Sequence, residues 1–280
     1  MDLLLTVELG VVAAGAAILG SMLGLGGGVF LVPIFTLFLG IDPKLAIGAS
    51  AVVVVVNSVV GSSVHLRSRF TNLRLAMLLQ VTTALGAILG ALFGVGADPS
   101  IVYLVFGLVL VYAAVSMGIP RSNKLVALAA DPMRLGGIYH DPATGDEVPY
   151  VPVRIAPGLG VSLGAGVLSG MLGVGGGVVM VPAMNLLMRV PVKAAVGTSA
   201  FMVGVTSVAT AFVFYANGKL APDIIVPAVV GVFLGGQVGS RLTRRIRAQR
   251  LSLLFGVILL YLGLSLVLRA LGIELPGQQK

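Results

Sequence analysis

The sequence predicts an all-α polytopic membrane protein built from two inverted-topology repeats, and three observations lead to this fold class. Hydrophobic residues make up 58% of the 280-residue chain and charged residues only 10%, with a mean hydropathy of +1.09. A glycine-rich segment occurs twice, and basic residues gather in different loops of the two halves. A soluble protein of this length would need more polar surface than this composition supplies.

The apolar stretches of the chain indicate membrane-spanning helices. Stretches long enough to cross a hydrocarbon core of about 30 Å recur along the sequence. In that core every backbone polar group must be paired within the protein, so a spanning segment is a helix or a strand of a closed barrel. Barrel strands alternate apolar and polar residues, whereas a run such as AVVVVVNSVV at 51–60 does not. We therefore expect helices.

An internal repeat divides the chain. MLGLGGGVFLVP begins at Met22, and MLGVGGGVVMVP begins at Met171, 149 residues later. The same offset relates Lys44 to Lys193 without any insertion, and a match this long indicates a duplication. We predict repeat 1 over residues 1–118, a polar linker over 119–155, repeat 2 over 156–270 and a tail over 271–280.

Loop charge predicts that the two repeats are inverted. Repeat 1 carries Arg67, Arg69 and Arg74 in its first loop between helices, whereas repeat 2 carries its arginines in its second, 241–250. Basic loops stay in the cytoplasm, so equivalent loops lie on opposite sides of the membrane. Both termini are then outside, and the linker 119–155 and the loop 241–250 are cytoplasmic. Each repeat is a glycine-broken hairpin plus three helices: 3–40 with 45–66, 73–95 and 99–118, and 157–188 with 193–215, 222–240 and 250–270.

The glycine turns are expected inside the membrane. In the first hairpin about 20 apolar residues precede the glycines and about 12 follow them. A helix of 12 residues reaches roughly 18 Å, which is less than a full crossing. We therefore expect the two turns to enter from opposite faces and to meet near the midplane.

The glycines of these turns are the first candidate substrate-binding residues. A glycine turn leaves backbone N–H groups uncovered, and the helix that follows begins with a dipole that favours anions. Two such turns would form an anion site without a charged side chain, and close helix packing is the alternative reading. The residues are Gly24, Gly26, Gly27, Gly28, Gly173, Gly175, Gly176 and Gly177.

Polar side chains inside apolar runs form a second candidate group. Ser50 and Asn57 lie two helical turns apart and so share a face. Their repeat equivalents are Ser199 and Thr206, and Thr198 stands beside Ser199. We expect these five residues to contact the substrate, although such side chains also bond neighbouring helices.

Three further residues are candidates for gating or hinge motion. Pro33 and Pro182 follow the glycines of each turn and would shape the short arm, unless they are only tolerated membrane prolines. His65 lies near the cytoplasmic end of a predicted helix, next to Arg67, where a histidine can gate or simply mark a loop edge.

The residues that the sequence lacks restrict the function. There is no cysteine, which excludes disulfides and thiolate metal sites. No charged residue lies in the middle of an apolar run, whereas proton and sodium carriers usually show a buried carboxylate there. A membrane enzyme would need a nucleophile, a metal cluster or a buried acid. We expect no enzyme activity, no metal, no cofactor and no nucleic-acid partner; the expected partners are a small anion and the lipid bilayer, and a homodimer is left open.

The doubled M-L-G-[LV]-G-G-G-V…V-P segment, each copy followed by K-x-A-[IV]-G-[AT]-S, resembles the TauE/SafE sulfite exporter family over both repeats. The resemblance implies a permease of the bacterial inner membrane that moves sulfite, sulfonates or related small anions. We expect a secondary transporter that exports sulfite or a small organosulfonate by alternating access around a midplane site. The alternative is a small-anion channel, or a permease for another inorganic anion. The sequence specifies neither the exact substrate, the direction, the coupling ion nor the oligomeric state.

Overall fold

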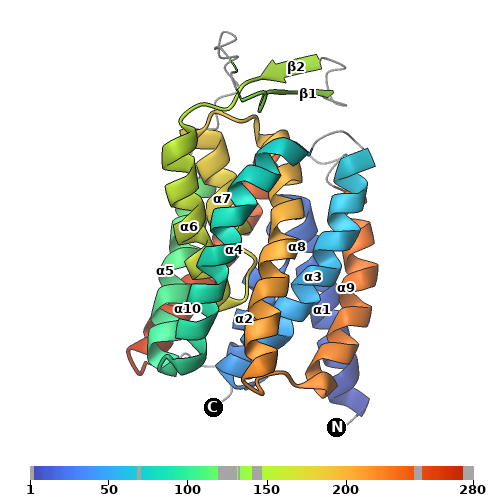
Figure 1. Ribbon diagram of the computed structural model, residues 1–280. Helices are drawn as coiled ribbons and strands as arrows, with labels where there is room; N and C mark the ends of the chain where they lie inside the picture. The colour runs from blue at the N-terminus through green and yellow to red at the C-terminus, as the bar shows by residue number, and fades with distance from the viewer. Residues whose placement is uncertain are drawn as a thin grey trace.

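The computed structural model describes residues 3–67, 71–118, 131, 133–140, 147–242 and 248–273. Figure 1 shows a bundle of helices with two short strands across one end. The helices of the first half are α1 (Leu3–Leu23), α2 (Gly28–Leu37), α3 (Pro43–Arg67), α4 (Leu73–Gly96) and α5 (Pro99–Gly118). The strands β1 (Gly137–His140) and β2 (Glu147–Tyr150) precede α6 (Ile155–Leu172), α7 (Gly177–Pro182), the π-helix η1 (Ala183–Leu187), α8 (Val192–Ala216), α9 (Pro222–Leu242) and α10 (Ala248–Ala270).

Six helices in the described part of the chain are long and apolar enough to cross a membrane, namely α3, α4, α5, α6, α8 and α9. Their outer surfaces expose large apolar side chains such as Leu89, Phe212 and Phe233, each with half or more of its surface accessible. Continuous exposure of this kind would be unfavourable in water and suits contact with lipid. The chain is therefore a mainly helical, multi-pass membrane protein.

Two helices begin at the same local signal. α3 begins at Pro43 and α5 at Pro99, and proline fits the first turn of a helix because no N–H is needed there. The preceding residues, Asp42 and Asp98, each accept a hydrogen bond of 2.9 Å from a backbone N–H of that first turn. The Asp-Pro pairs thus set these helix starts locally.

Two helix pairs pack at very close range through glycine. A Cβ added to Gly86 or Gly90 of α4 would overlap the backbone carbonyls of Leu163 and Val167 in α6. Small residues let helix backbones approach in this way within a membrane. The pair α1 and α9 repeats the arrangement at the offset of 149, with Gly235 and Gly239 against Ala14 and Ile18.

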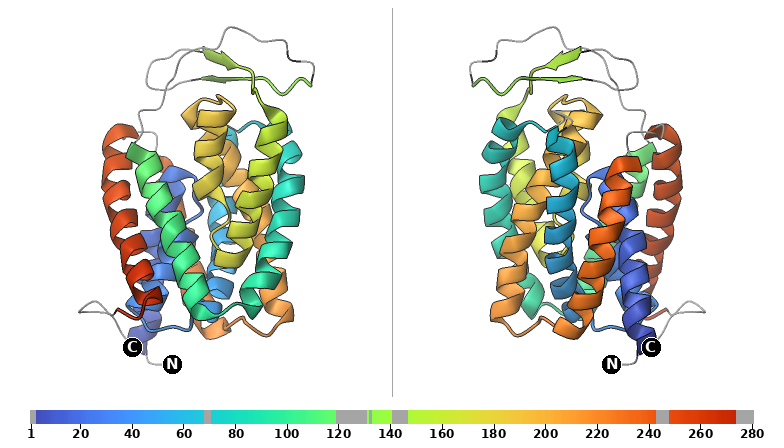
Figure 2. Two further views of the ribbon diagram at one scale, coloured as in Figure 1. Left: turned by 90° about the vertical axis from the view of Figure 1, so that its left-hand side faces the viewer. Right: turned by 90° about the vertical axis from the view of Figure 1, so that its right-hand side faces the viewer.

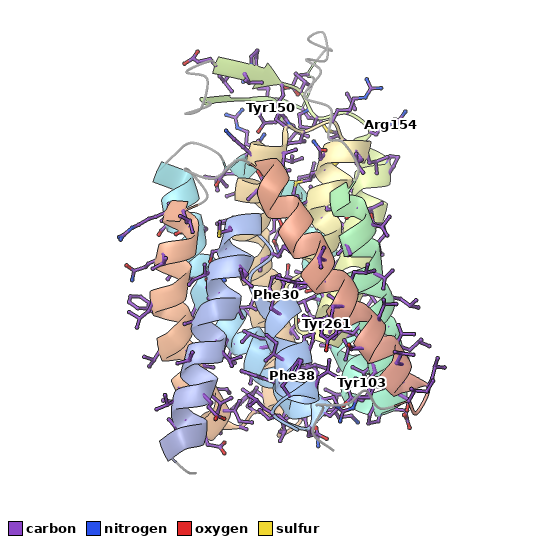
Figure 3. All side chains as sticks on the ribbon, turned by 180° about the vertical axis from the view of Figure 1, so that it is seen from behind. Phe30, Phe38, Tyr103, Tyr150, Arg154 and Tyr261 are labelled. Carbon is purple, nitrogen blue, oxygen red and sulfur yellow. The ribbon has the colours of Figure 1, made fainter. Side chains whose placement is uncertain are left out.

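The short helices point toward opposite faces of the bundle. α1 begins and α10 ends at one face, and β1 and β2 lie at the other (Figure 2). α2 runs from the interior toward the first face, as Phe30 and Phe38 mark in Figure 3, and Arg269 Nη1 donates to Thr36 O near its end at 2.8 Å. α7 and η1 run toward the strand face, where Met188 O accepts from Val153 N at 3.1 Å.

The linker contains an antiparallel strand pair that the sequence analysis did not predict. Strands β1 and β2 pair in register, from Gly137 opposite Tyr150 to His140 opposite Glu147. Asn72, which caps α4, donates from Nδ2 to Leu135 O at 2.8 Å and to the Tyr150 hydroxyl at 3.3 Å. The strand pair is thus fastened to the helix bundle by polar contacts.

Candidate functional site

The two glycine turns have the same backbone geometry. In the first turn φ is +69° at Gly24, +79° at Gly26 and +87° at Gly27. The equivalent glycines of the second turn, Gly173, Gly175 and Gly176, have φ of +68°, +78° and +78°. L-residues with a side chain rarely adopt these values, so the turns require glycine.

The structure brings the two turns into contact. A Cβ added to Gly28 would lie 2.8 Å from Gly173 O, and one added to Gly177 would lie 2.7 Å from Gly24 O. Each turn therefore leaves room for the other only because these positions carry no side chain. The contact is also reciprocal, because at the offset of 149 Gly28 is equivalent to Gly177, and Gly24 is equivalent to Gly173.

Two predicted site residues hold this contact together. Ser50 Oγ donates to Gly173 O at 3.0 Å, and Ser199 Oγ donates to Gly24 O at 3.3 Å. Each serine belongs to the opposite half of the chain from the turn that it binds. Because a hydroxyl has one hydrogen, neither serine has a hydrogen left to donate to another group in this state.

The turns lie deep within the bundle. A Cβ on Gly26 would meet the side chains of Val54 and Val203, and a Cβ on Gly175 would meet Val203. These valines stand near the midpoints of α3 and α8, each of 25 residues. A helix of that length spans about 37 Å, so the turns are far from both ends of the helices.

The turns carry buried backbone donors. Within the described part of the chain, the N–H groups of residues 26–29 and 175–178 donate no hydrogen bond, and all of these residues are buried. Buried N–H groups are nearly always paired. Here they stand at the start of α2 and of the continuous helical segment Gly177–Leu187, where the helix dipole is positive. The arrangement is suited to an anion.

Asn57 closes the first turn from the side. Its Nδ2 donates to Gly26 O at 2.9 Å, and its Oδ1 accepts from Ser21 Oγ at 2.7 Å. Asn57 is 2% exposed, so both ends of its amide are used within the protein. Ser21 was not among the predicted residues, although it is a polar residue in the apolar long arm directly before the glycines.

The two threonines among the predicted residues make other contacts. Thr206 Oγ1 donates to Met202 O at 2.9 Å and accepts from Gln80 Nε2 at 3.1 Å. Thr198 Oγ1 accepts from the backbone N–H of Asn72 at 3.0 Å. Neither hydroxyl is bonded to a glycine turn, and Thr198 is fastened instead to the start of α4.

Polar atoms without a partner gather beside the second turn. Among the described residues five buried side chains have a polar atom that makes no hydrogen bond, and three of these are Gln80 Oε1, Ser169 Oγ and Ser207 Oγ. A Cβ on Gly175 would lie 3.0 Å from Ser207 Oγ, and a Cβ on Gly176 would lie 3.7 Å from Ser169 Oγ. None of these three residues is among the five polar residues that were predicted to contact the substrate. The other two atoms are Asn185 Oδ1 in η1 and Ser265 Oγ in α10.

The predicted hinge residues occupy different settings. Pro33 lies inside α2 and is buried, whereas Pro182 ends α7 and is followed by the π-helix η1. Each proline lacks the N–H that a helix would use, and only the second arm changes its helix type there. His65 lies in α3, but its side chain lies outside the described part of the structure.

A comparison with protein families matches residues 9–266 to the family described as sulfite exporter TauE/SafE. Relatives of full length share low identity with the chain. A probable membrane transporter protein, YunE of Bacillus subtilis, is 25% identical over 95% of this chain and 98% of its own length. A probable membrane transporter protein of Xylella fastidiosa is 27% identical over 89% of this chain and 90% of its own length.

A third relative shows a similar identity and coverage. The probable membrane transporter protein MJ0441 of Methanocaldococcus jannaschii is 25% identical over 90% of this chain and 91% of its own length. No solved structure matches the chain significantly. Because the family model covers both glycine turns and nearly all of the described helices, the chain belongs to the TauE/SafE sulfite exporter family.

Proposed function

We propose that this protein is a secondary transporter that exports sulfite or a small organosulfonate across the bacterial inner membrane by alternating access. The substrate is held between the two glycine turns, by backbone N–H groups and neighbouring hydroxyl or amide groups that replace its water of hydration. Both termini lie outside, and the strand-bearing linker and the loop 241–250 are cytoplasmic. The family and the names of the relatives support membrane transport.

The unpaired N–H groups at the two turns carry this proposal. A buried backbone donor without a partner costs free energy of about 1–3 kcal/mol, and several such donors lie in each of the two turns. An oxyanion with several acceptor oxygens would pair them and would also interact favourably with the two helix starts. A sulfo group has this form and needs no metal or charged side chain to be bound.

The relation between the halves supports alternating access through inverted repeats. The turn contacts, the serine bonds and the glycine helix pairs all recur at the offset of 149. The short helices α2 and α7 run toward opposite faces (Figure 1). An arrangement of this kind lets one half open the site to one side and the other half to the opposite side.

The test substitutes alanine at one turn glycine in each half, Gly27→Ala and Gly176→Ala. Alanine at a positive φ costs about 1–2 kcal/mol, so the turn relaxes and its N–H groups move. We expect sulfite efflux from proteoliposomes to fall at least about tenfold in each variant. Gly218→Ala is the matched control, because Gly218 has φ +67° in a loop with open space around it.

Efflux at the wild-type rate in both turn variants would contradict the glycine site. Efflux in the wild type that does not saturate, and that carries current far above carrier rates, would instead favour the alternative of a small-anion channel. Loss of efflux in Gly218→Ala as well would assign the effect to folding rather than to the turns.

A further inference from the structure

The two turns differ in the side chains around them. Beside the first turn, Asn57 and Ser21 satisfy each other and the backbone. Beside the second turn lie Ser169 and Ser207. Gln80 bonds Thr206, the chain neighbour of Ser207, and we name these four residues the second-turn cluster. Three of its four members have an unpartnered polar atom, and no described side chain beside the first turn does.

The orientation of the Gln80 amide follows from its neighbour. Thr206 donates its one hydroxyl hydrogen to Met202 O, so its Oγ1 can only accept from Gln80. The atom of Gln80 that faces Thr206 at 3.1 Å is therefore the amide nitrogen Nε2. The unpartnered atom is Oε1, an acceptor on a side chain that is 9% exposed.

The two serines of the cluster supply donors. Ser169 is 0% exposed and Ser207 is 1% exposed, and neither hydroxyl has a partner. Their oxygens flank Gly176 and Gly175, whose N–H groups are also unpaired. Hydroxyl and backbone donors thus gather at the same turn.

A sequence difference between the halves accompanies the unpartnered hydroxyl of Ser207. Its repeat equivalent, Ser58, donates to Ala200 O and packs on Gly204. Gly204 offers no side chain, so Ser58 can reach the helix backbone. The position equivalent to Gly204 is Val55, which has a branched side chain, and Ser207 makes no equivalent bond.

We propose that the second-turn cluster binds the substrate directly and selects oxyanions that carry their own O–H or N–H donor. This inference rests on the proposed transport function and names the class of substrate. Ser169 and Ser207 donate to the anionic oxygens beside the unpaired N–H groups, and Gln80 Oε1 accepts from the substrate's donor. Hydroxyalkyl and aminoalkyl sulfonates and protonated sulfite have such a donor, whereas sulfate and unsubstituted alkyl sulfonates have none.

The first test compares two ligands of similar size on the purified full-length protein in detergent. Isethionate carries a hydroxyl that ethanesulfonate lacks, and a site that hydrogen-bonds a substrate hydroxyl rejects the analogue without it. We expect wild-type protein to bind isethionate about tenfold more tightly. Gln80→Met keeps the side-chain length but removes the acceptor, so the two affinities should become equal. The control Gln237→Met changes a glutamine of α9 outside the cluster and should keep the wild-type ratio.

The second test compares the two equivalent serines with sulfite as the probe. Ser207→Ala removes an unpartnered hydroxyl, so we expect the affinity to fall about tenfold or more while Tm stays level or rises. Ser58→Ala removes a bonded hydroxyl, so Tm should fall while the affinity for sulfite stays within about twofold of wild type. A purely structural role for Ser207 would instead lower Tm and leave the affinity unchanged.

The outcomes separate this inference from the proposed function. If wild-type protein binds neither sulfite nor isethionate, the proposed function itself fails. If it binds sulfite but binds isethionate no better than ethanesulfonate, the substrate class is overturned. If Ser207→Ala and Ser58→Ala have equal effects on affinity, the assignment of the site to the second turn is overturned.

Discussion

The two glycine turns share a backbone but differ in how their polar side chains are used. At the first turn, Asn57 links Gly26 O to Ser21, and every bond of the amide stays within the protein. At the second turn, Thr206 stands where Asn57 would be, and Ser169 and Ser207 have no partner. The first turn is therefore closed by its own side chains, and the second keeps hydrogen-bonding capacity for another molecule.

Under the proposed function, this difference separates the residues that stabilise the fold from those that bind the substrate. Features that recur in both halves, such as the glycine contacts between helices, hold the bundle together in each. A feature found in one half only is not needed to hold a half together, because the other half folds without it. An unpartnered buried group is unfavourable for folding, which agrees with the ligand proposed at the second turn.

The largest expected effect concerns a feature that the halves share. Gly90→Val and Gly239→Val each place a side chain against a backbone carbonyl of the neighbouring helix. The helices cannot separate without losing their contact, so we expect each variant to lose about 3 kcal/mol or more of unfolding free energy. Thermal unfolding in detergent measures the loss.

The controls for that prediction are Gly15→Val and Gly164→Val. These equivalent glycines have no atom within 4 Å of an added Cβ, so only the small change in helix propensity applies. If only one of Gly90→Val and Gly239→Val lost much unfolding free energy, the helix packing would not be equivalent in the two halves.

A smaller effect should distinguish the halves. Asn57→Ala removes two hydrogen bonds and leaves Gly26 O and Ser21 Oγ without partners, so we expect a loss of about 2 kcal/mol. Thr206→Ala removes one interhelical bond from a cluster that already holds unpaired groups, and we expect about 0.6 kcal/mol. Equal losses in chemical or thermal unfolding would show that the second turn is closed as firmly as the first.

The smallest effect concerns a contact between the linker and repeat 1 that has no equivalent in repeat 2. Asn72 caps α4 and bonds the Tyr150 hydroxyl, whereas the equivalent position of repeat 2 is Ala221. We expect Tyr150→Phe to cost about 0.5 kcal/mol. A cost above that of Asn57→Ala would make the linker part of the folding core.

The same tyrosine predicts a dependence on pH. Burial raises the pKa of the Tyr150 phenol above its ordinary 10.0, and the hydrogen bond from Asn72 lowers it in part. The folded state thus holds the proton more tightly than the unfolded state, so this stabilisation is complete below pH 10 and is lost as pH rises through the folded pKa. Thermal unfolding measured across that range should show an alkaline decline that is smaller in Tyr150→Phe.

Some features of the fold and site were accessible from the sequence because they depend on local chemistry. The apolar runs set the helices long enough to span a membrane, and the Asp-Pro pairs set the starts of α3 and α5. The strands β1 and β2 were missed because the polar segment 119–155 was interpreted only as a linker. Ser169 was missed because its repeat equivalent is Gly20, so a search for matching polar residues passes over it.

The sequence by itself determined the repeat, the family and the positions of the glycine turns, since positive φ at Gly27 and Gly176 and apolar helix length are properties of residues close together in the chain. The tertiary structure decided which polar atoms find a partner. Ser50 reaches a carbonyl 123 residues away, and Ser207 has no partner whereas its repeat equivalent Ser58 donates to Ala200 O. Hydrogen-bond satisfaction depends on neighbours brought together from distant parts of the chain, and a pattern within one segment cannot report it.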